Sequence, residues 1–391
     1  MLTICELFQK HEAAAQASYD PSLITEAHVL TLANEAQLCE ENKQYIKAFL
    51  DEADETVLRF IWRFYHFLFC TEEDFSADIW QLDIIQMPEP IETKYPGCLK
   101  SVVYLLAADH LRAWQQSRGL PAAMIDEYYD RYRNFVRLNL ISPETYGLCR
   151  LSPFLYGYAK PFMLRVGRLN FQRYCYKDYC EMYEDAQGNR LFAALPNYGY
   201  NAEGLRDDAG VKPQYQKTQD TLLAHVFDGN GRLKPKAEEI DLKKWTLVLQ
   251  PGDAVWTIHI PGGRKLNIDE VLQSIADAAK LFEQHFPPYK AFVCHTWFID
   301  PGLRGEIIRE GSNMAAFADL FDIISGPDNE NHSIYEHVFQ VKKQPLENLV
   351  PQNEFQARIL KRALEGKKIY WSYGVLKKDV AAHVLRLEAK S

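Results

Sequence analysis

The stretch from residue 253 to residue 299 constrains the fold of this chain most. Residues 254–260 (AVWTIHI) have the composition of a buried strand and end abruptly at a Pro-Gly-Gly turn. Residues 267–286 carry apolar side chains at helical spacing, and residues 291–299 (AFVCHTWFI) again have the composition of an interior strand. A strand, a tight turn, a helix and a second strand form a βαβ unit. We therefore expect the two strands to be adjacent and parallel.

The helix of this unit has a clear start and a clear end. Asn267 and Glu270 form the N-x-x-E pattern of a capping box, and Val271 begins the apolar face. Pro287 and Pro288 cannot continue the helix, so it is expected to end before them.

The rest of the chain divides into a helical half and a half rich in strands. Apolar residues recur at helical spacing in residues 48–70, 101–116 and 121–140, with no strand-like run between them. We therefore expect an all-helical N-terminal domain, residues 1–146, with essentially no sheet. Residues 147–391 should form an α+β domain, a mixed sheet flanked by helices. Its further elements are expected as strands at 164–176, 191–195, 222–227, 245–249, 322–325, 334–341 and 369–376, helices at 312–321 and 354–365, and a long surface loop or lid at 197–219.

Composition narrows the choice of partners. The net charge is −9, and no block of Lys and Arg interrupts it, which disfavours a nucleic acid or an anionic membrane. Residues 1–15 contain charged side chains, so we predict no signal peptide and a cytoplasmic protein. The eight cysteines form no CxxC pair and are expected to be free thiols. Cys175 and Cys180 have no further ligands at suitable spacing, so no metal site is predicted.

Four blocks of the C-terminal half carry a resemblance to a known family: GRLNFQ (residues 167–172), HIPGGRKL (259–266), FVCHTWFIDP (292–301) and SNMAAF (312–317). In sequence, order and spacing they resemble a bacterial family of uncharacterised proteins assigned as acyltransferases. Its members join a helical N-terminal domain to a GNAT-like C-terminal domain. The resemblance implies a GNAT-like mixed sheet, with acetyl-CoA or another acyl-CoA as co-substrate.

The resemblance also implies where the CoA thioester binds. In GNAT enzymes its pyrophosphate meets backbone N–H groups at the N-terminus of the helix after the central strand, where unpaired donors and the helix dipole favour an anion. Here the turn is PGGRKLN, which departs from the usual Q/R-x-x-G-x-G/A form, and Asp269 and Glu270 place carboxylates in the first helical turn. For Asn313 the alternative is a structural place at a helix start. The implied cofactor-binding residues are Ile260, Gly262, Gly263, Arg264, Lys265 and Asn313.

Two histidines are the candidate catalytic groups. His259 ends its strand two residues before Pro261, at the carboxyl edge of the sheet, where ligands of α/β proteins usually bind. His295 is expected on the neighbouring strand, so both imidazoles can line one cleft, and His259 is the favoured general base. The alternative is that each is a buried structural histidine. Asp300 can orient His295 or cap the following helix. Cys294 should point to the opposite face, which disfavours a Cys–His nucleophilic pair.

Three functions compete on this evidence. The favoured one is direct transfer of an acyl group from CoA to an amine or hydroxyl acceptor, with the helical half supplying an acceptor wall or a cover. The second is a non-catalytic binding protein for a small molecule or a partner. The third is a hydrolase that uses His295 and Asp300. Tyr335 and His337, on an expected strand, are further candidate acids, and Arg168 is expected to brace the sheet through carboxylate pairing.

Overall fold

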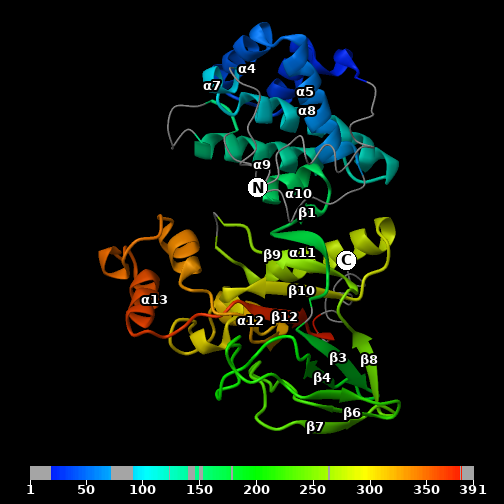
Figure 1. Ribbon diagram of the computed structural model, residues 1–391, viewed down its shortest axis with the longest axis vertical. Coiled ribbons are helices and arrows are strands. Elements are labelled where there is room, and N and C mark those ends of the chain that lie inside the picture. The colour runs from blue at the N-terminus through cyan, green and yellow to red at the C-terminus, as the bar shows by residue number, and fades with distance from the viewer. Residues whose placement is uncertain are drawn as a thin grey trace. The chain divides into compact units, whose positions relative to one another are not determined.

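The computed structural model describes residues 19–71, 91–122, 124–139, 146–148, 153–177, 179–262, 265–378 and 380 (Figure 1). The chain forms two compact units, Met1–Arg165 and Val166–Ser391. Each unit is described by itself below.

The elements described before β1 are all helical, as the sequence predicts. The central helix is α8, whose residues from Cys98 to Ala108 are buried and which packs against α3, α4, α5, α9 and α10. None of the described helices combines the length and the apolar character that a membrane span needs. The helices are η1 (Pro21–Ile24), α3 (Glu26–Glu35), α4 (Glu40–Glu52), α5 (Glu55–Tyr65), its π-helical continuation η2 (His66–Cys70), α7 (Ile91–Lys94), α8 (Cys98–Ser117), α9 (Met124–Asn139) and α10 (Pro153–Ala159).

Side-chain caps set where these helices begin. Thr25 Oγ1 accepts the backbone N–H of His28 at 3.2 Å, and Asp54 Oδ1 accepts that of Val57 at 2.9 Å. Each cap satisfies one of the N–H groups that the first helical turn leaves without a partner. The face of α5 that carries Val57 and Phe64 then packs into the core of the unit.

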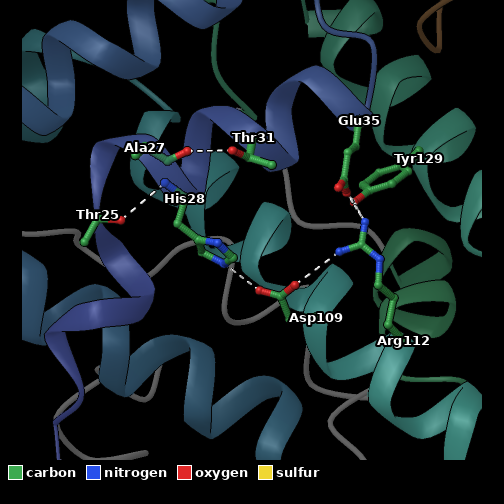
Figure 2. Close-up of polar contacts among 8 residues, drawn as sticks. All are labelled: Thr25, Ala27, His28, Thr31, Glu35, Asp109, Arg112 and Tyr129. Carbon is green, nitrogen blue, oxygen red and sulfur yellow. Dashed lines mark hydrogen bonds and ion pairs between the residues drawn. The ribbon is translucent and has the colours of Figure 1, made fainter.

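A polar network joins α3, α8 and α9 at the edge of this core (Figure 2). His28 Nε2 lies 2.7 Å from Asp109 Oδ2, and Arg112 Nη1 donates to Asp109 Oδ1 at 3.2 Å. Arg112 also pairs with Glu35, which accepts the hydroxyl of Tyr129 at 2.7 Å. In this α3–α8–α9 network every charged side chain meets an opposite charge or a hydrogen-bond donor.

Five strands of the second unit, together with β1 at the division between the units, form a six-stranded sheet with the order β1-β2-β9-β10-β12-β11. Strands β9 and β10 are adjacent and parallel, which confirms the predicted βαβ unit. The pairs β2–β9, β10–β12 and β12–β11 are antiparallel, so the sheet is mixed, as predicted. The strands are β1 (Met163–Val166), β2 (Leu169–Cys175), β9 (Ala254–His259), β10 (Ala291–Thr296), β11 (Phe321–Ile324) and β12 (Ser372–Leu376), and the principal helices are α11 (Ile268–His285), α12 (Asn313–Ala318) and α13 (Glu354–Leu364).

The two faces of this sheet are covered by different parts of the chain. Helix α11 covers one face, where Trp256 stacks on Phe282 with their ring centroids 3.7 Å apart. On the other face Val255 and Val293 share a core with Tyr179, which belongs to the segment between β2 and β9. We call this segment, residues 176–253, the insertion. It contains a sheet of order β4-β3-β8 and a sheet of order β5-β6-β7, formed by β3 (Cys180–Asp185), β4 (Arg190–Ala194), β5 (Tyr215–Lys217), β6 (Thr221–Ala224), β7 (Glu238–Asp241) and β8 (Trp245–Leu249).

Three predicted strands were wrong in whole or in part. Residues 164–176 form the separate strands β1 and β2, because the chain turns at Gly167 with φ +55°. The strand expected at 291–299 ends at Thr296, whose hydroxyl accepts the N–H of Phe298 and begins the 3₁₀ helix η3 (Trp297–Ile299). Residues expected as a strand at 334–341 form the π-helix η5 (Ile334–Phe339), so Tyr335 and His337 are helical.

Candidate functional site

The parallel strands β9 and β10 pair at their beginnings only. Their register runs from Val255 opposite Ala291 to Thr257 opposite Val293 and then ends. Beyond that point β9 continues to pair with β2 as far as His259, and β10 continues to pair with β12 as far as Thr296. The two strands therefore part at their carboxyl ends, where the backbone groups that face the gap pair with no other strand of the described residues.

The thiol of Cys294 lies on the α11 side of this opening. Its Sγ donates to the carbonyl oxygen of Ile258 at 3.4 Å, and burial raises its pKa. Alternation along β10 predicts that Cys294 points to the face opposite to His295, and this contact agrees with the prediction. A buried, protonated thiol is a poor nucleophile, so the site is not a Cys–His pair.

His259 and His295 lie where the strands part, on the face covered by the insertion. Thr257 on β9 lies opposite Val293 on β10. His259 and His295 each follow two residues later, so both point to the same face of the sheet as that pair. His259 Nε2 is hydrogen-bonded to Oε1 of Gln172 on β2 at 2.9 Å, which fixes the orientation of its ring. The structure thus brings the two predicted imidazoles together.

Burial keeps both imidazoles neutral at physiological pH. It lowers the pKa of His259 to about 4, and the neighbouring His295 adds to the effect. Burial also lowers the pKa of His295 to about 4, assisted by the positive charges of Lys177 and Arg206. Nε2 of His295 is buried and has no hydrogen-bond partner among the described residues. A neutral imidazole with an open ring nitrogen can accept a proton from a nucleophile.

Aromatic rings enclose His295. The centroid of its ring lies 6.3 Å from that of Tyr179, 5.8 Å from that of Trp371 and 5.9 Å from that of Tyr373. Tyr179 comes from the insertion, whereas Trp371 and Tyr373 come from the chain at the start of β12. The hydroxyl of Tyr373 is buried and lies beside the backbone N–H of Lys177.

Asp300 is placed as a backbone anchor. One carboxylate oxygen accepts the N–H of Gly302 and the other that of Tyr370, both at 2.8 Å, and the residue is buried. Burial raises the pKa of this carboxyl group. The hydrogen bonds of the carboxylate within the described residues go to these backbone groups and not to His295. The arrangement favours the capping alternative that the sequence left open.

The predicted phosphate turn leads from β9 into α11. Ile260 is partly buried, Lys265 is exposed, and a side chain added at Gly262 would meet no atom within 4 Å. Asn267 caps α11 as predicted, with Oδ1 accepting the N–H of Asp269 at 2.9 Å. Gly263 and Arg264 lie outside the described residues. The open space beside Gly262 leaves room for a ligand to approach the backbone.

Asn313 braces the same turn. Its Nδ2 donates to the carbonyl oxygen of Leu266 at 2.5 Å, and Ser312 supplies the cap of α12 by accepting the N–H of Ala315. Asn313 therefore holds the turn from the side of α12. The remaining candidates lie elsewhere: the hydroxyl of Tyr335 donates to the carbonyl of Gln344 at 2.8 Å, and Arg168, whose N–H donates to Ser274, is buried.

Several residues of the site were not predicted as site residues. Gln172 lies in the GRLNFQ block, where its even spacing from Asn170 could have placed it on the face of His259. Tyr373 and Tyr179 gave no local signal, because only the folded sheet and insertion bring them to His295. Among the described residues no group of three or more His, Cys, Asp or Glu side chains is arranged to hold a metal ion.

Comparisons with known proteins agree with this architecture. The family model for the GNAT-like C-terminal domain matches residues 163–376. A crystal structure of an acyltransferase mutant in complex with octanoyl-CoA superposes with a TM-score of 0.56 and 16% identity, over 89% of this chain and 86% of that chain. An acyltransferase in complex with decanoyl-CoA and teicoplanin superposes with a TM-score of 0.56 and 16% identity, over 90% of this chain and 88% of that chain. An acyltransferase in complex with CoA and 10C-teicoplanin superposes with a TM-score of 0.55 and 17% identity, over 89% of this chain and 86% of that chain. No curated protein matches the sequence.

Proposed function

The chain belongs to the family of proteins with a GNAT-like C-terminal domain, and on that premise we propose that it transfers an acyl group directly from a CoA thioester to an amine or hydroxyl acceptor. The observation that carries the proposal is the parting of β9 and β10 beyond Thr257 and Val293. Backbone groups freed by this parting can polarise a thioester carbonyl without any rearrangement, which lowers the barrier to attack. Two solved structures with a similar fold are acyltransferases bound to acyl-CoA.

The proposed place for the CoA phosphates is the turn between β9 and α11. The N-terminus of an 18-residue helix, an exposed Lys265 and the open space beside Gly262 favour an anion there. The exposed carboxylates of Asp269 and Glu270 oppose it. Asn313 keeps the turn in place through Leu266. Gly263 and Arg264 stay predicted contacts.

The proposed reaction needs one proton acceptor. The amine or hydroxyl of the acceptor attacks the carbonyl carbon, the new C–N or C–O bond forms, the C–S bond breaks, and the thiolate of CoA leaves. Nε2 of His295 is open and receives the proton that the nucleophile loses, and the imidazolium formed returns that proton to the leaving thiolate. His259, oriented by Gln172, lies beside it and is the second candidate for the same role.

Thiol release from octanoyl-CoA and decanoyl-CoA tests the proposal. The protein is incubated with either thioester and a panel of amines and alcohols, free thiol is followed by its reaction with a chromogenic disulfide, and products are identified by mass spectrometry. Acyl transfer predicts thiol release that depends on the acceptor, with a product heavier by one acyl group. Free octanoate with no acylated acceptor would indicate a hydrolase instead. Binding of the thioester without any thiol release would indicate a non-catalytic binding protein.

A further inference from the structure

We propose that the acceptor carries a carboxylate, and that Arg206 of the insertion binds it beside His295. The inference rests on the proposed function, because it names the chemical class of the acceptor. It begins from a cation that the fold places in an unusual setting. The side chain of Arg206 is only 10% exposed, although it belongs to a loop of the insertion.

Two aromatic rings hold the guanidinium group in place. Its Cζ lies 3.5 Å from the centroid of the Tyr198 ring and 5.4 Å from that of Tyr179. These two rings are 5.4 Å apart and tilted against each other. A guanidinium held over aromatic faces retains its charge and loses little side-chain entropy when it binds an anion. Arg206 is therefore preorganised for this task.

The charge of Arg206 is only partly balanced by the protein. Its carboxylate partner within the described residues is Asp208, whose Oδ1 accepts from Nε at 3.1 Å. The side chain of Asp208 is 70% exposed, so this anion stays largely in water while the cation is buried. Nη1 and Nη2 have no carboxylate partner in the described part of the chain. The edge of the guanidinium group formed by these two nitrogens suits a planar carboxylate, which accepts two parallel hydrogen bonds.

The loop that carries Arg206 is built to a fixed shape. Tyr200 forms backbone bridges to both Arg206 and Val211, so the loop closes on itself. Two of its glycines cannot be replaced without a clash: a Cβ at Gly204 would lie 2.3 Å from the carbonyl oxygen of Leu233, and one at Gly210 would lie 2.3 Å from that of Tyr200. The predicted lid at 197–219 is thus, around Arg206, a close-packed loop that positions a side chain.

Tyr179 connects this cation to the acyl-transfer site. Its ring lies next to both Arg206 and His295. Around it, the hydroxyl of Tyr200 and Nε2 of His295 are buried without a hydrogen-bond partner among the described residues. Buried polar groups in native proteins nearly always have partners, so such a cluster indicates that a ligand supplies them. An acceptor with an anionic end at Arg206 and its nucleophile at His295 meets this requirement.

A pair of product-like probes tests the inference without any need for turnover. N-octanoyl-phenylalanine and N-octanoyl-phenylalaninamide have nearly the same shape and differ in the charge of one end. We expect calorimetry to show that the carboxylate binds the full-length protein about 10- to 100-fold more tightly than the carboxamide. Equal affinity for the two probes, or no measurable binding of either, overturns the inference.

Three variants assign the preference to Arg206. Arg206→Gln should remove the difference between the two probes, whereas Arg309→Gln, at a side chain that is 61% exposed and pairs with Glu354, should keep it. Asp208→Asn removes the competing anion and should tighten binding of the carboxylate a few-fold. If Arg206 only braces its loop, Arg206→Gln lowers the melting temperature but leaves the ratio of the two affinities unchanged, which also overturns the inference.

The same protein separates this inference from the proposed function. Octanoyl-CoA is titrated into each preparation alongside the two probes. If octanoyl-CoA binds and the probes bind equally, the acyltransferase proposal stands and the carboxylate site is wrong. If the carboxylate preference depends on Arg206 while octanoyl-CoA does not bind, the anion site stands and the acyltransferase proposal is wrong.

Discussion

Two histidine-centred sites within the described residues differ in how completely their polar groups are satisfied. In the α3–α8–α9 network His28 meets Asp109, and the chain of contacts continues through Arg112 to Glu35. In the sheet unit His295 presents a buried ring nitrogen with no partner among the described residues. The side chain of His28 is 31% exposed. That of His295 is largely buried, and burial lowers its pKa to about 4.

This difference distinguishes a histidine that stabilises the fold from a histidine that is a candidate for catalysis. A histidine whose partners are all supplied by the protein ties helices together, because each contact opposes the separation of the elements that carry it. A buried histidine with an open nitrogen costs stability and is retained where a ligand completes it. On this comparison we propose that His28 serves the fold and that His295 serves the reaction.

The largest expected effect is on turnover. His295→Gln keeps the approximate size of the side chain but removes the nitrogen that accepts a proton, so we expect the rate of acyl transfer to fall about 10²- to 10⁴-fold. His28→Gln, the matched change in the helical unit, should leave the rate unchanged. Steady-state thiol release under saturating octanoyl-CoA measures both. A normal rate in His295→Gln would move the role of base to His259 and break the comparison.

The next effect is on stability against pH. His259 and His295 have folded pKa values of about 4, below the ordinary value of 6.5, so the unfolded chain binds more protons. The contribution of the two neutral imidazoles to the free energy of unfolding is therefore complete above about pH 6.5, and it is lost as the pH falls toward 4. We expect each imidazole to account for on the order of 1–3 kcal/mol in this window. Urea unfolding at pH 7 and pH 4.5 measures the loss, which His295→Gln should reduce. An equal loss in the variant would contradict the assignment.

A smaller effect is expected in the helical unit. Asp109→Asn weakens the contacts to His28 and Arg112, which are about one third exposed, so the free energy of unfolding should fall by about 1 kcal/mol. Thiol release should not change once the protein is folded. Urea unfolding and the thiol assay on the same preparation check both statements. A loss of activity without a loss of stability would show that this network also serves catalysis.

The sequence predicted the parts of the fold that local signals determine. The strand pattern before Pro261, the cap at Asn267 and the second apolar strand were sufficient for β9, α11 and β10. The single strand expected at 164–176 failed because Gly167, which carries a positive φ, turns the chain within it. Residues 334–341 have strand-like composition, yet residues 334–339 form a π-helix. In the latter case apolar composition alone did not distinguish a strand from a short buried helix.

The candidate site was predictable only where its residues belong to the two strands of the βαβ unit. His259 and His295 were found because parallel neighbours bring their carboxyl ends to one edge. Tyr373 and Arg206 were missed, since one lies on a strand that returns at the end of the chain and the other on a loop of the insertion. Tyr373 reaches His295 because β12 pairs with β10 in a register that sets the two residues opposite each other. Arg206 approaches it through the packing of the insertion on the sheet, and no local spacing encodes either contact.

Calorimetric titration with octanoyl-CoA tests the central claim most directly, because the proposed function requires a CoA thioester at the turn between β9 and α11. We expect one octanoyl-CoA per chain. Reversal of charge at Lys265 (Lys265→Glu) should weaken the affinity severalfold, whereas Lys361→Glu on α13, at a side chain that is 78% exposed, should leave it unchanged. Absence of binding to the unaltered protein at millimolar octanoyl-CoA, or equal affinity in the two variants, would contradict the account.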